Sequence, residues 1–234
     1  MAGKPYNLGL DSANFSKLEL CAEIKKQVPH PAVRATLTYM NWDHGIKLHH
    51  DGDLPARSSM GSSSSFTVGL LNAMRALNGQ ISSKVLLATE SIHIEQNVMH
   101  ETVGCQDQLA AAYGGLNKFE FAHDSSHDVR PLTLQQARVE RLENHLLLMY
   151  TGIRRTASDV ADTYVGDITT KHRQLHTLRS MVDEAISILG STDDIRRFGE
   201  LLHESWLMQR SLSPQVSNSD VDDIYGVHSP LGAK

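Results

Sequence analysis

The chain has 234 residues, 40% of them hydrophobic, which is enough to bury a core in one large domain or two small ones. Its formal net charge of −5 gives no basic field that would attract nucleic acid. No apolar run reaches the length of a membrane span, and the N-terminal residues lack the apolar region of a secretory signal. Two cysteines far apart in sequence make no disulfide framework. These features predict a cytoplasmic globular protein with neither nucleic-acid nor membrane partners.

The first elements expected along the chain are a helix and a strand. Residues 1–28 offer at most one short amphipathic helix, whereas residues 29–40 predict a helix that Pro31 opens near its first turn. Residues 45–50 then predict a strand.

A loop of small residues follows and leads into an amphipathic helix. One glycine and four serines precede apolar residues that recur at three- and four-residue steps, namely Phe66, Leu70, Ala73, Met74 and Leu77. The first N–H groups of a helix lack intrahelical partners and carry the positive end of its dipole, so this arrangement is suited to holding a phosphate. A serine-rich run is also typical of a flexible linker or a plain N-cap, and both alternatives stay open. No Gly-Lys-Ser/Thr follows the glycine, which excludes a Walker A loop.

Two further helices carry acidic residues. Gly79 ends the first amphipathic helix, and Ser82 is expected to cap a second one that runs to about residue 99 and contains Glu95. Asp107 falls at the start of an alanine-rich helix that ends at Gly114. The plain interpretation of Asp107 is an acidic residue that favours the helix dipole, and that of Glu95 is a charge on a solvated helix face.

The second half of the chain predicts a short strand region and then helices. Residues 116–121 and 129–134 alternate like strands, and the polar residues between them indicate a long hairpin or a domain boundary. A short helix and a strand at 145–151 follow. Helices are expected near 153–165, 168–189, 193–211 and 218–226, with Gly190 and Pro214 as breaks. His172 and His176 are spaced i, i+4, which is more typical of a solvated pair than of a metal site when no further ligand motif accompanies them.

Three segments together resemble the GHMP kinases. Pro55, Ser58, Gly61 and the serines from 62 to 65, followed by FTVGLLNA, are similar to the second motif of that family. The segments GCQDQLAAAYGGLNKFEF (104–121) and LLLMYTGIRRTASDV (146–160) make the likeness greatest to the D-glycero-D-manno-heptose 7-phosphate kinases within the family. The resemblance covers nearly the whole chain, from about residue 29 to the end.

The resemblance implies an α+β, GHMP kinase-like fold of two domains. Residues 1–135 would form an N-terminal α/β domain with a phosphate loop opening a helix, and residues 136–234 a mostly helical C-terminal domain. Glycine-rich segments that correspond to the family's first and third motifs have no counterpart here, so both domains are expected to be truncated. Ser59 and Met60 replace the usual Gly-Leu, and Cys105 replaces a lysine.

The resemblance also implies roles for particular residues and two cofactors, ATP and Mg²⁺. The phosphates would be held by residues of the loop and the first helical turn: Pro55, Ser58, Gly61, Ser62, Ser63 and Ser64. Ser63, or its neighbour Ser62, and Glu95 would bind Mg²⁺. Asp107 would be the base that accepts a proton from the sugar, and Arg155 would hold a substrate phosphate.

The activity implied is transfer of the γ-phosphate of ATP to the anomeric hydroxyl of a sugar. The best match is D-glycero-D-manno-heptose 7-phosphate, giving the 1,7-bisphosphate for nucleotide-activated heptose synthesis. Another sugar (galactose, fucose or glucuronate) is an alternative. A second alternative is an inactive remnant that binds a nucleotide or a partner. Because two of the three glycine-rich motifs have no counterpart, turnover by the chain as it stands is expected to be absent or very low.

Overall fold

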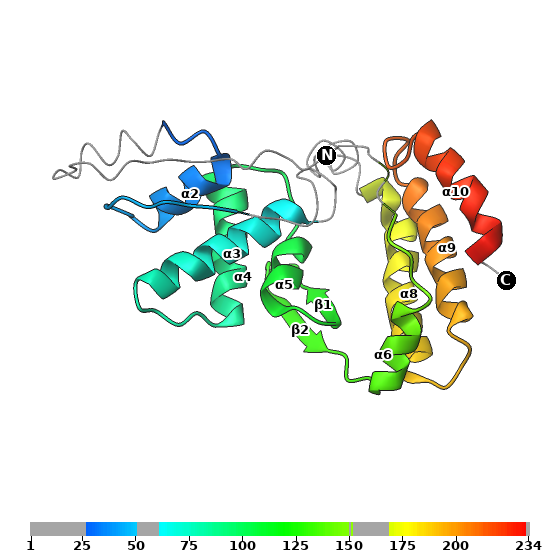
Figure 1. Cartoon of the computed structure of the whole chain (residues 1–234). Helices are drawn as coiled ribbons and strands as arrows, with labels where there is room; N and C mark the ends of the chain where they lie inside the picture. Colours follow the sequence, from blue (N-terminus) through cyan, green and yellow to red (C-terminus); the bar gives the residue numbers. More distant parts are fainter. Residues whose placement is uncertain (1–26, 51–60, 150, 152–168, 233–234) are drawn as a thin grey trace. The chain divides into compact units, whose positions relative to one another are not determined.

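The structure, a computed structural model, describes residues 27–50, 61–149, 151 and 169–232 (Figure 1). Pro55, Ser58, Arg155 and the helix expected at 153–165 lie outside these residues. Contacts within the chain separate the described residues into two compact units, one up to Gly115 and the other from Leu116 on. Residues 116–135 thus pack with the second unit, and the division of the chain into family domains near residue 135 stays a prediction.

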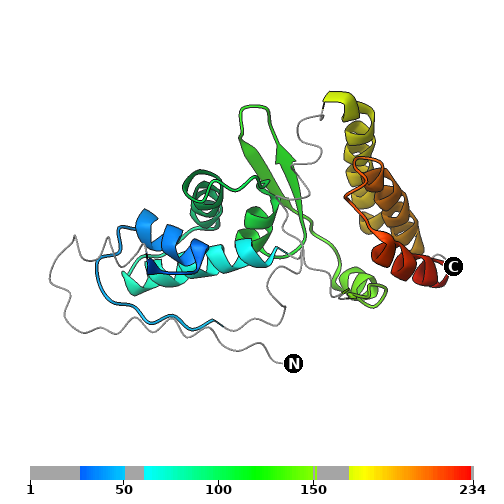
Figure 2. The same cartoon turned by 90° about the horizontal axis from the view of Figure 1, so that it is seen from above.

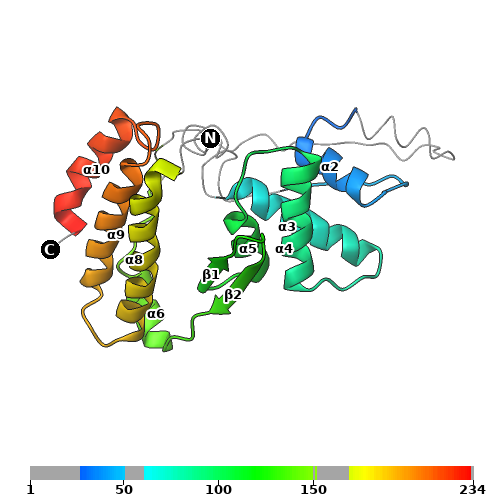
Figure 3. The same cartoon turned by 180° about the vertical axis from the view of Figure 1, so that it is seen from behind.

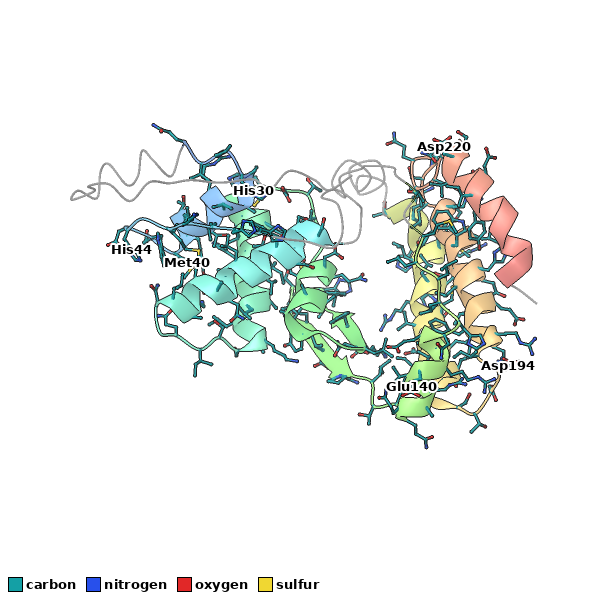
Figure 4. The ribbon with its side chains drawn as sticks, in the orientation of Figure 1. His30, Met40, His44, Glu140, Asp194 and Asp220 are labelled. Atoms are coloured by element: carbon teal, nitrogen blue, oxygen red, sulfur yellow. The ribbon has the colours of Figure 1, made fainter. Side chains whose placement is uncertain are left out.

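The first unit consists of helices. In chain order these are α2 (Pro31–Tyr39), α3 (Ser62–Leu77), α4 (Lys84–His93), the π-helix η1 (Ile94–Val98) and α5 (Gln106–Tyr113) (Figure 1). Pro31 is in the first turn of α2, and its missing N–H is one that the helix would leave unpaired anyway. His30 and Met40, labelled in Figure 4, mark the two ends of this helix. The predictions of a helix opened by Pro31 and of a helix beginning at Ser62 are confirmed.

Helix α3 is the centre of the apolar core of this unit. One cluster joins Met74 to Val33 and Leu37 of α2, and a second joins Leu71 to Leu87 of α4 and Ile94 of η1. Met74 and Leu71 have no exposed surface. Because apolar residues at three- and four-residue steps hold α3 between its neighbours, the N-terminus of this helix is fixed in place relative to α4, η1 and α5.

A buried polar network adds to the contacts between α2, α3 and α4. The carboxylate of Glu90 accepts two hydrogen bonds from the guanidinium of Arg75, one of them from Nε at 2.9 Å. The hydroxyl of Tyr39 donates to the same carboxylate at 3.1 Å. Burial, and then the negative charge of Glu90, raise the pKa of the Tyr39 hydroxyl above its usual range.

Three details of the first unit differ from expectation. Residues 45–50 form no strand, and only Leu48 makes an isolated bridge. Ser83 rather than Ser82 caps α4, because the Oγ atom of Ser83 accepts the Leu86 N–H at 3.1 Å. The single helix expected from 82 to 99 changes at Ile94 into η1, a wider turn of a kind that is frequent at functional sites.

The second unit contains a β-hairpin and several helices. Strands β1 (Asn117–Phe121) and β2 (His127–Pro131) are antiparallel, so the polar residues between them form a hairpin loop. The helices are α6 (Gln136–Glu143), α8 (His172–Gly190), α9 (Arg196–Arg210) and α10 (Ser219–Gly232). Figures 2 and 3 both show α8 and α9 side by side. The breaks at Gly190 and Pro214 are confirmed.

Arg138 of α6 ties the end of α8 to the loop that follows it. Its guanidinium donates to the carbonyl oxygens of Ile188 at 2.7 Å, Leu189 at 3.3 Å and Asp193 at 2.8 Å. The bonds to Ile188 and Leu189 reach carbonyl groups in the last turn of α8, at its negative end, and the bond to Asp193 holds the loop. The strand expected at 145–151 is wrong for its described residues, which form no strand.

The described residues were also compared with the requirements of a membrane-spanning helix and of a metal-binding cluster. No helix there is long and apolar enough to cross a membrane. His172 and His176 are both exposed on α8, and the ranges that the structure describes hold no cluster of three or more potential His, Cys, Asp or Glu ligands.

Candidate functional site

The N-terminus of α3 carries no capping side chain from the described residues. Its N-cap is Gly61, whose φ of 67° lies in the left-handed region that favours glycine. The first helical hydrogen bond runs from the N–H of Ser65 to the carbonyl of Gly61 at 2.9 Å. The N–H groups of the preceding serines therefore have no partner in the helix, and no acidic residue lies in its first turn. The positive end of the helix dipole is left for an anion.

Asp107 lies directly beside this N-terminus. A Cβ atom built on Gly61 would be 3.4 Å from both Cγ and Oδ2 of Asp107. Asp107 belongs to the first turn of α5, and its side chain is exposed. An accessible carboxylate thus adjoins the helix end that is suited to hold a phosphate.

Glu95 is a buried carboxylate on η1, with 2% of its surface exposed. Its Oε2 atom accepts a hydrogen bond from the Ser64 hydroxyl at 2.9 Å and another from the Gln108 amide. Burial raises the pKa of Glu95 above its usual range, and the hydrogen bonds from Ser64 and Gln108, together with the hydroxyl of Thr67, partly oppose this shift. The interpretation of Glu95 as a charge on a solvated face is therefore wrong.

The serines at the start of α3 differ in what they contact. Ser64 is buried and its hydroxyl is used by Glu95. Ser63 is exposed, and its carbonyl oxygen accepts the Thr67 hydroxyl at 3.0 Å. Ser62 is half-buried. The helix therefore turns one serine inward to Glu95 and leaves Ser63 open to a ligand.

The environment of Glu95 fits a magnesium ion. The Oε1 atom is buried and has no hydrogen-bond partner in the described part of the chain. Buried polar atoms are nearly always paired, so an unpaired carboxylate oxygen calls for a cation or a donor. Mg²⁺ takes oxygen ligands and commonly uses one or two carboxylates together with phosphates of its substrate. The Glu95 carboxylate, the Ser63 hydroxyl at the start of α3 and a nucleotide would supply such a set.

Sequence reasoning missed two residues of this cluster. Both residues are buried: Gln108 donates a hydrogen bond to Glu95, and Thr67, whose hydroxyl donates to the Ser63 carbonyl at 3.0 Å, helps to lower the pKa of Glu95. The sequence offered one clue to Gln108, which is that it directly follows Asp107 in the segment that resembles the family. Pro55, Ser58 and Arg155 fall outside the residues whose placement is described, so their assignment rests on sequence alone.

Comparison with known proteins finds one family model and several relatives that are similar to this chain. Residues 10–115 match the GHMP kinases N terminal domain. A D-glycero-alpha-D-manno-heptose 7-phosphate kinase of Campylobacter jejuni is 26% identical over 222 residues, which are 94% of this chain and 63% of the relative. The chain thus spans less than two thirds of the length of that protein.

Two solved structures share the fold. A structure described as a D-glycero-D-manno-heptose 1-phosphate kinase from Bacteroides thetaiotaomicron has a TM-score of 0.61 at 22% identity, over 77% of this chain and 53% of that one. A sugar kinase structure from Campylobacter jejuni has a TM-score of 0.57 at 22% identity, over 97% of this chain and 62% of that one. The resemblance inferred from the motifs is confirmed, although the family match begins at residue 10 and not at about residue 29: residues 10–115 match the GHMP kinases N terminal domain, and the chain has a GHMP kinase-like α+β fold.

Proposed function

We propose that this chain uses Mg-ATP to phosphorylate the anomeric hydroxyl of a sugar phosphate, with D-glycero-D-manno-heptose 7-phosphate as the acceptor. The observation that carries the proposal is the position of the exposed Asp107 carboxylate against Gly61, at the uncapped N-terminus of α3. Support for the acceptor comes from the heptose kinase that is 26% identical to the chain.

Phosphoryl transfer depends mainly on positioning and on neutralising charge, because the protein has little covalent chemistry to perform. The free N–H groups at the start of α3 would bind phosphate oxygens, and the hydroxyls of Ser62 and Ser63 would add hydrogen bonds. Pro55 and Ser58 would complete the loop that approaches the nucleotide.

Glu95, through its unpaired Oε1, and Ser63, through its exposed hydroxyl, would hold Mg²⁺ together with the nucleotide phosphates. A bound Mg²⁺ would neutralise charge on the β- and γ-phosphate oxygens. Ser64 acts indirectly, since its hydroxyl is committed to Oε2 of Glu95.

Asp107 would accept the proton of the attacking hydroxyl. A carboxylate that hydrogen-bonds this hydroxyl can take its proton as the bond to phosphorus forms. The anomeric hydroxyl would therefore have to lie between Asp107 and the phosphate at the helix N-terminus.

Arg155 would bind the phosphate that the sugar already carries, through its planar guanidinium. A kinase that uses ATP in this way would act in the cytoplasm.

Phosphorus NMR of micromolar protein with Mg-ATP tests the proposal over hours, so that slow turnover is detected. The acceptors are heptose 7-phosphate, heptose 1-phosphate, galactose, fucose and glucuronate. The proposal predicts that heptose 7-phosphate alone gives a 1,7-bisphosphate and that Asp107→Asn slows formation of this product by about a hundredfold or more. The 1-phosphate would give the same bisphosphate by reaction at the other end, so the acceptor used identifies the site of transfer. Mg-ATP binding without any turnover that depends on Asp107 would instead establish an inactive nucleotide-binding remnant.

A further inference from the structure

Gln108 is more deeply buried than almost any other polar residue described, with 1% of its surface exposed. Its Nε2 atom donates a hydrogen bond to Oε2 of Glu95. Burying a primary amide is unfavourable unless it is hydrogen-bonded. Here the Nε2 bond goes to one particular carboxylate oxygen, while Oε1 of Gln108 has no partner among the described residues. The contact also joins α5 to η1, two elements that meet beside the start of α3.

The donors around Glu95 are distributed unequally between its two oxygens. Ser64 donates to Oε2 at 2.9 Å, and Gln108 donates to the same atom, whereas Oε1 has no partner among the described residues. A carboxylate held by two donors at one oxygen cannot rotate without breaking both hydrogen bonds. The free oxygen is therefore kept in one direction, as the carboxylate of a metal site requires.

We propose that Gln108 is a positioning residue for metal binding, which holds Glu95 so that its free oxygen is presented to the Mg²⁺ of the bound nucleotide. The inference rests on the proposed function and goes beyond it by assigning a role to a residue that does not itself touch nucleotide or sugar.

The start of α5 then sets two parts of the site at once. Asp107 and Gln108 are successive residues, and one side chain lies against Gly61 while the other reaches Glu95. A rotation of α5 would move the proposed base and the proposed metal ligand together. Placing both on one rigid turn keeps their geometry matched to the helix N-terminus between them.

Gln108→Met tests this role because it removes the donor and keeps nearly the same volume. Gln96→Met is the matched control: Gln96 also lies on the segment that carries Glu95, and its amide donates to the carbonyl of Val103 at 2.9 Å instead of to Glu95. Gln108→Asn is a second variant, which keeps a polar side chain in the buried position but shortens its reach. Thermal unfolding of each variant verifies that it is folded.

The measurement is Mn²⁺ binding to the protein with ATP, followed by electron paramagnetic resonance, alongside metal-free ATP affinity. Loss of a residue that orients a metal ligand weakens metal binding by about ten- to a hundredfold. We expect that loss in Gln108→Met and Gln108→Asn, with unchanged metal-free ATP affinity, and no loss in Gln96→Met. Mn²⁺ affinity in both Gln108 variants equal to that of the unmutated chain would overturn the inference. Absence of Mn²⁺ binding by the unmutated chain would overturn the proposed metal site itself.

Discussion

Gly61 lies against the carboxylate of Asp107, so that a methyl group at position 61 would be 3.4 Å from both Cγ and Oδ2. The same glycine has a φ of 67° and begins α3. The backbone there favours glycine, and a side chain at this position would come into van der Waals contact with the proposed base. The contact between Gly61 and Asp107 therefore places the proposed base at the helix N-terminus that would bind the phosphates.

Replacing this glycine should therefore affect catalysis more than folding. Gly61→Ala introduces left-handed strain of about 1–2 kcal/mol and also places a methyl group in van der Waals contact with Asp107. Gly79→Ala is the control, because Gly79 has a φ of 71° and no atom lies within 4 Å of the place that its new methyl group would take. We expect similar losses of thermal stability in the two variants but a loss of phosphoryl transfer in Gly61→Ala alone. Equal turnover in both would show that the contact with Asp107 has no catalytic consequence.

Asp107→Asn and Glu95→Gln should separate the base from the metal ligand. The asparagine keeps the shape of Asp107 but accepts no proton, so slow turnover in the NMR assay should fall by about a hundredfold or more while Mg-ATP affinity changes little. Glu95→Gln leaves the base in place and removes a carboxylate ligand, so a higher Mg²⁺ concentration should be needed for half-maximal turnover. Near-normal turnover in Asp107→Asn would show that Asp107 is not the base and only interacts favourably with the dipole of α5.

The helix that organises the candidate site was predictable from sequence. The periodic apolar residues of α3 pack against α2, α4 and η1, and Gly61 with its serines marks the helix start within one residue. Asp107 at the start of α5 was equally visible, because an acidic residue preceded an alanine-rich run ending in glycine. Local patterns of this kind depend on neighbours only a few residues away along the chain.

The contacts that give the site its chemistry were not predictable in the same way. Glu95 and Ser64 are far apart in sequence, and only the packing of η1 against α3 brings them together. The change from α4 to η1 at Ile94 has no propensity signal, yet it occurs where Glu95 turns inward. The strand expected at 145–151 failed for a related reason. Apolar residues from Leu146 to Met149 resemble a buried strand, but they are exposed in the structure.

The buried ion pair of the first unit should be important for stability. Arg75→Met leaves the Glu90 carboxylate buried without its cation, at a cost of about 3 kcal/mol. The double variant Arg75→Met, Glu90→Gln removes the stranded charge and leaves an acceptor for Tyr39, so it should recover most of this loss. Urea unfolding of both variants measures the difference. A double variant no more stable than Arg75→Met would show that the charge of Glu90 is not what makes the single change costly.

The start of α9 should give a pH-dependent contribution to stability. Hydrogen bonds from Arg196 to Asp194, labelled in Figure 4, lower the pKa of this carboxyl from 3.8 to about 2. A lowered pKa means that the contribution is present above 3.8 and is lost as the pH falls towards about 2. Asp194→Asn should therefore lower the urea midpoint slightly at neutral pH, and the difference should shrink with acidification. The exposed Asp223→Asn serves as control, and a difference for Asp194→Asn that persists at low pH would contradict the assignment.

The central claim, that the N-terminus of α3 binds the phosphates of Mg-ATP, is tested most directly by titration calorimetry of Mg-ATP into the chain and its Ser62→Ala, Ser63→Ala double variant. Hydrogen bonds to a charged group contribute about 1.5–3 kcal/mol, so we expect one binding site in the unmutated chain and an affinity at least about tenfold weaker in the double variant. Ser180→Ala, an exposed change on α8, should leave the affinity unchanged. Equal affinity in the unmutated chain and the double variant, or no binding by the unmutated chain, would contradict the account.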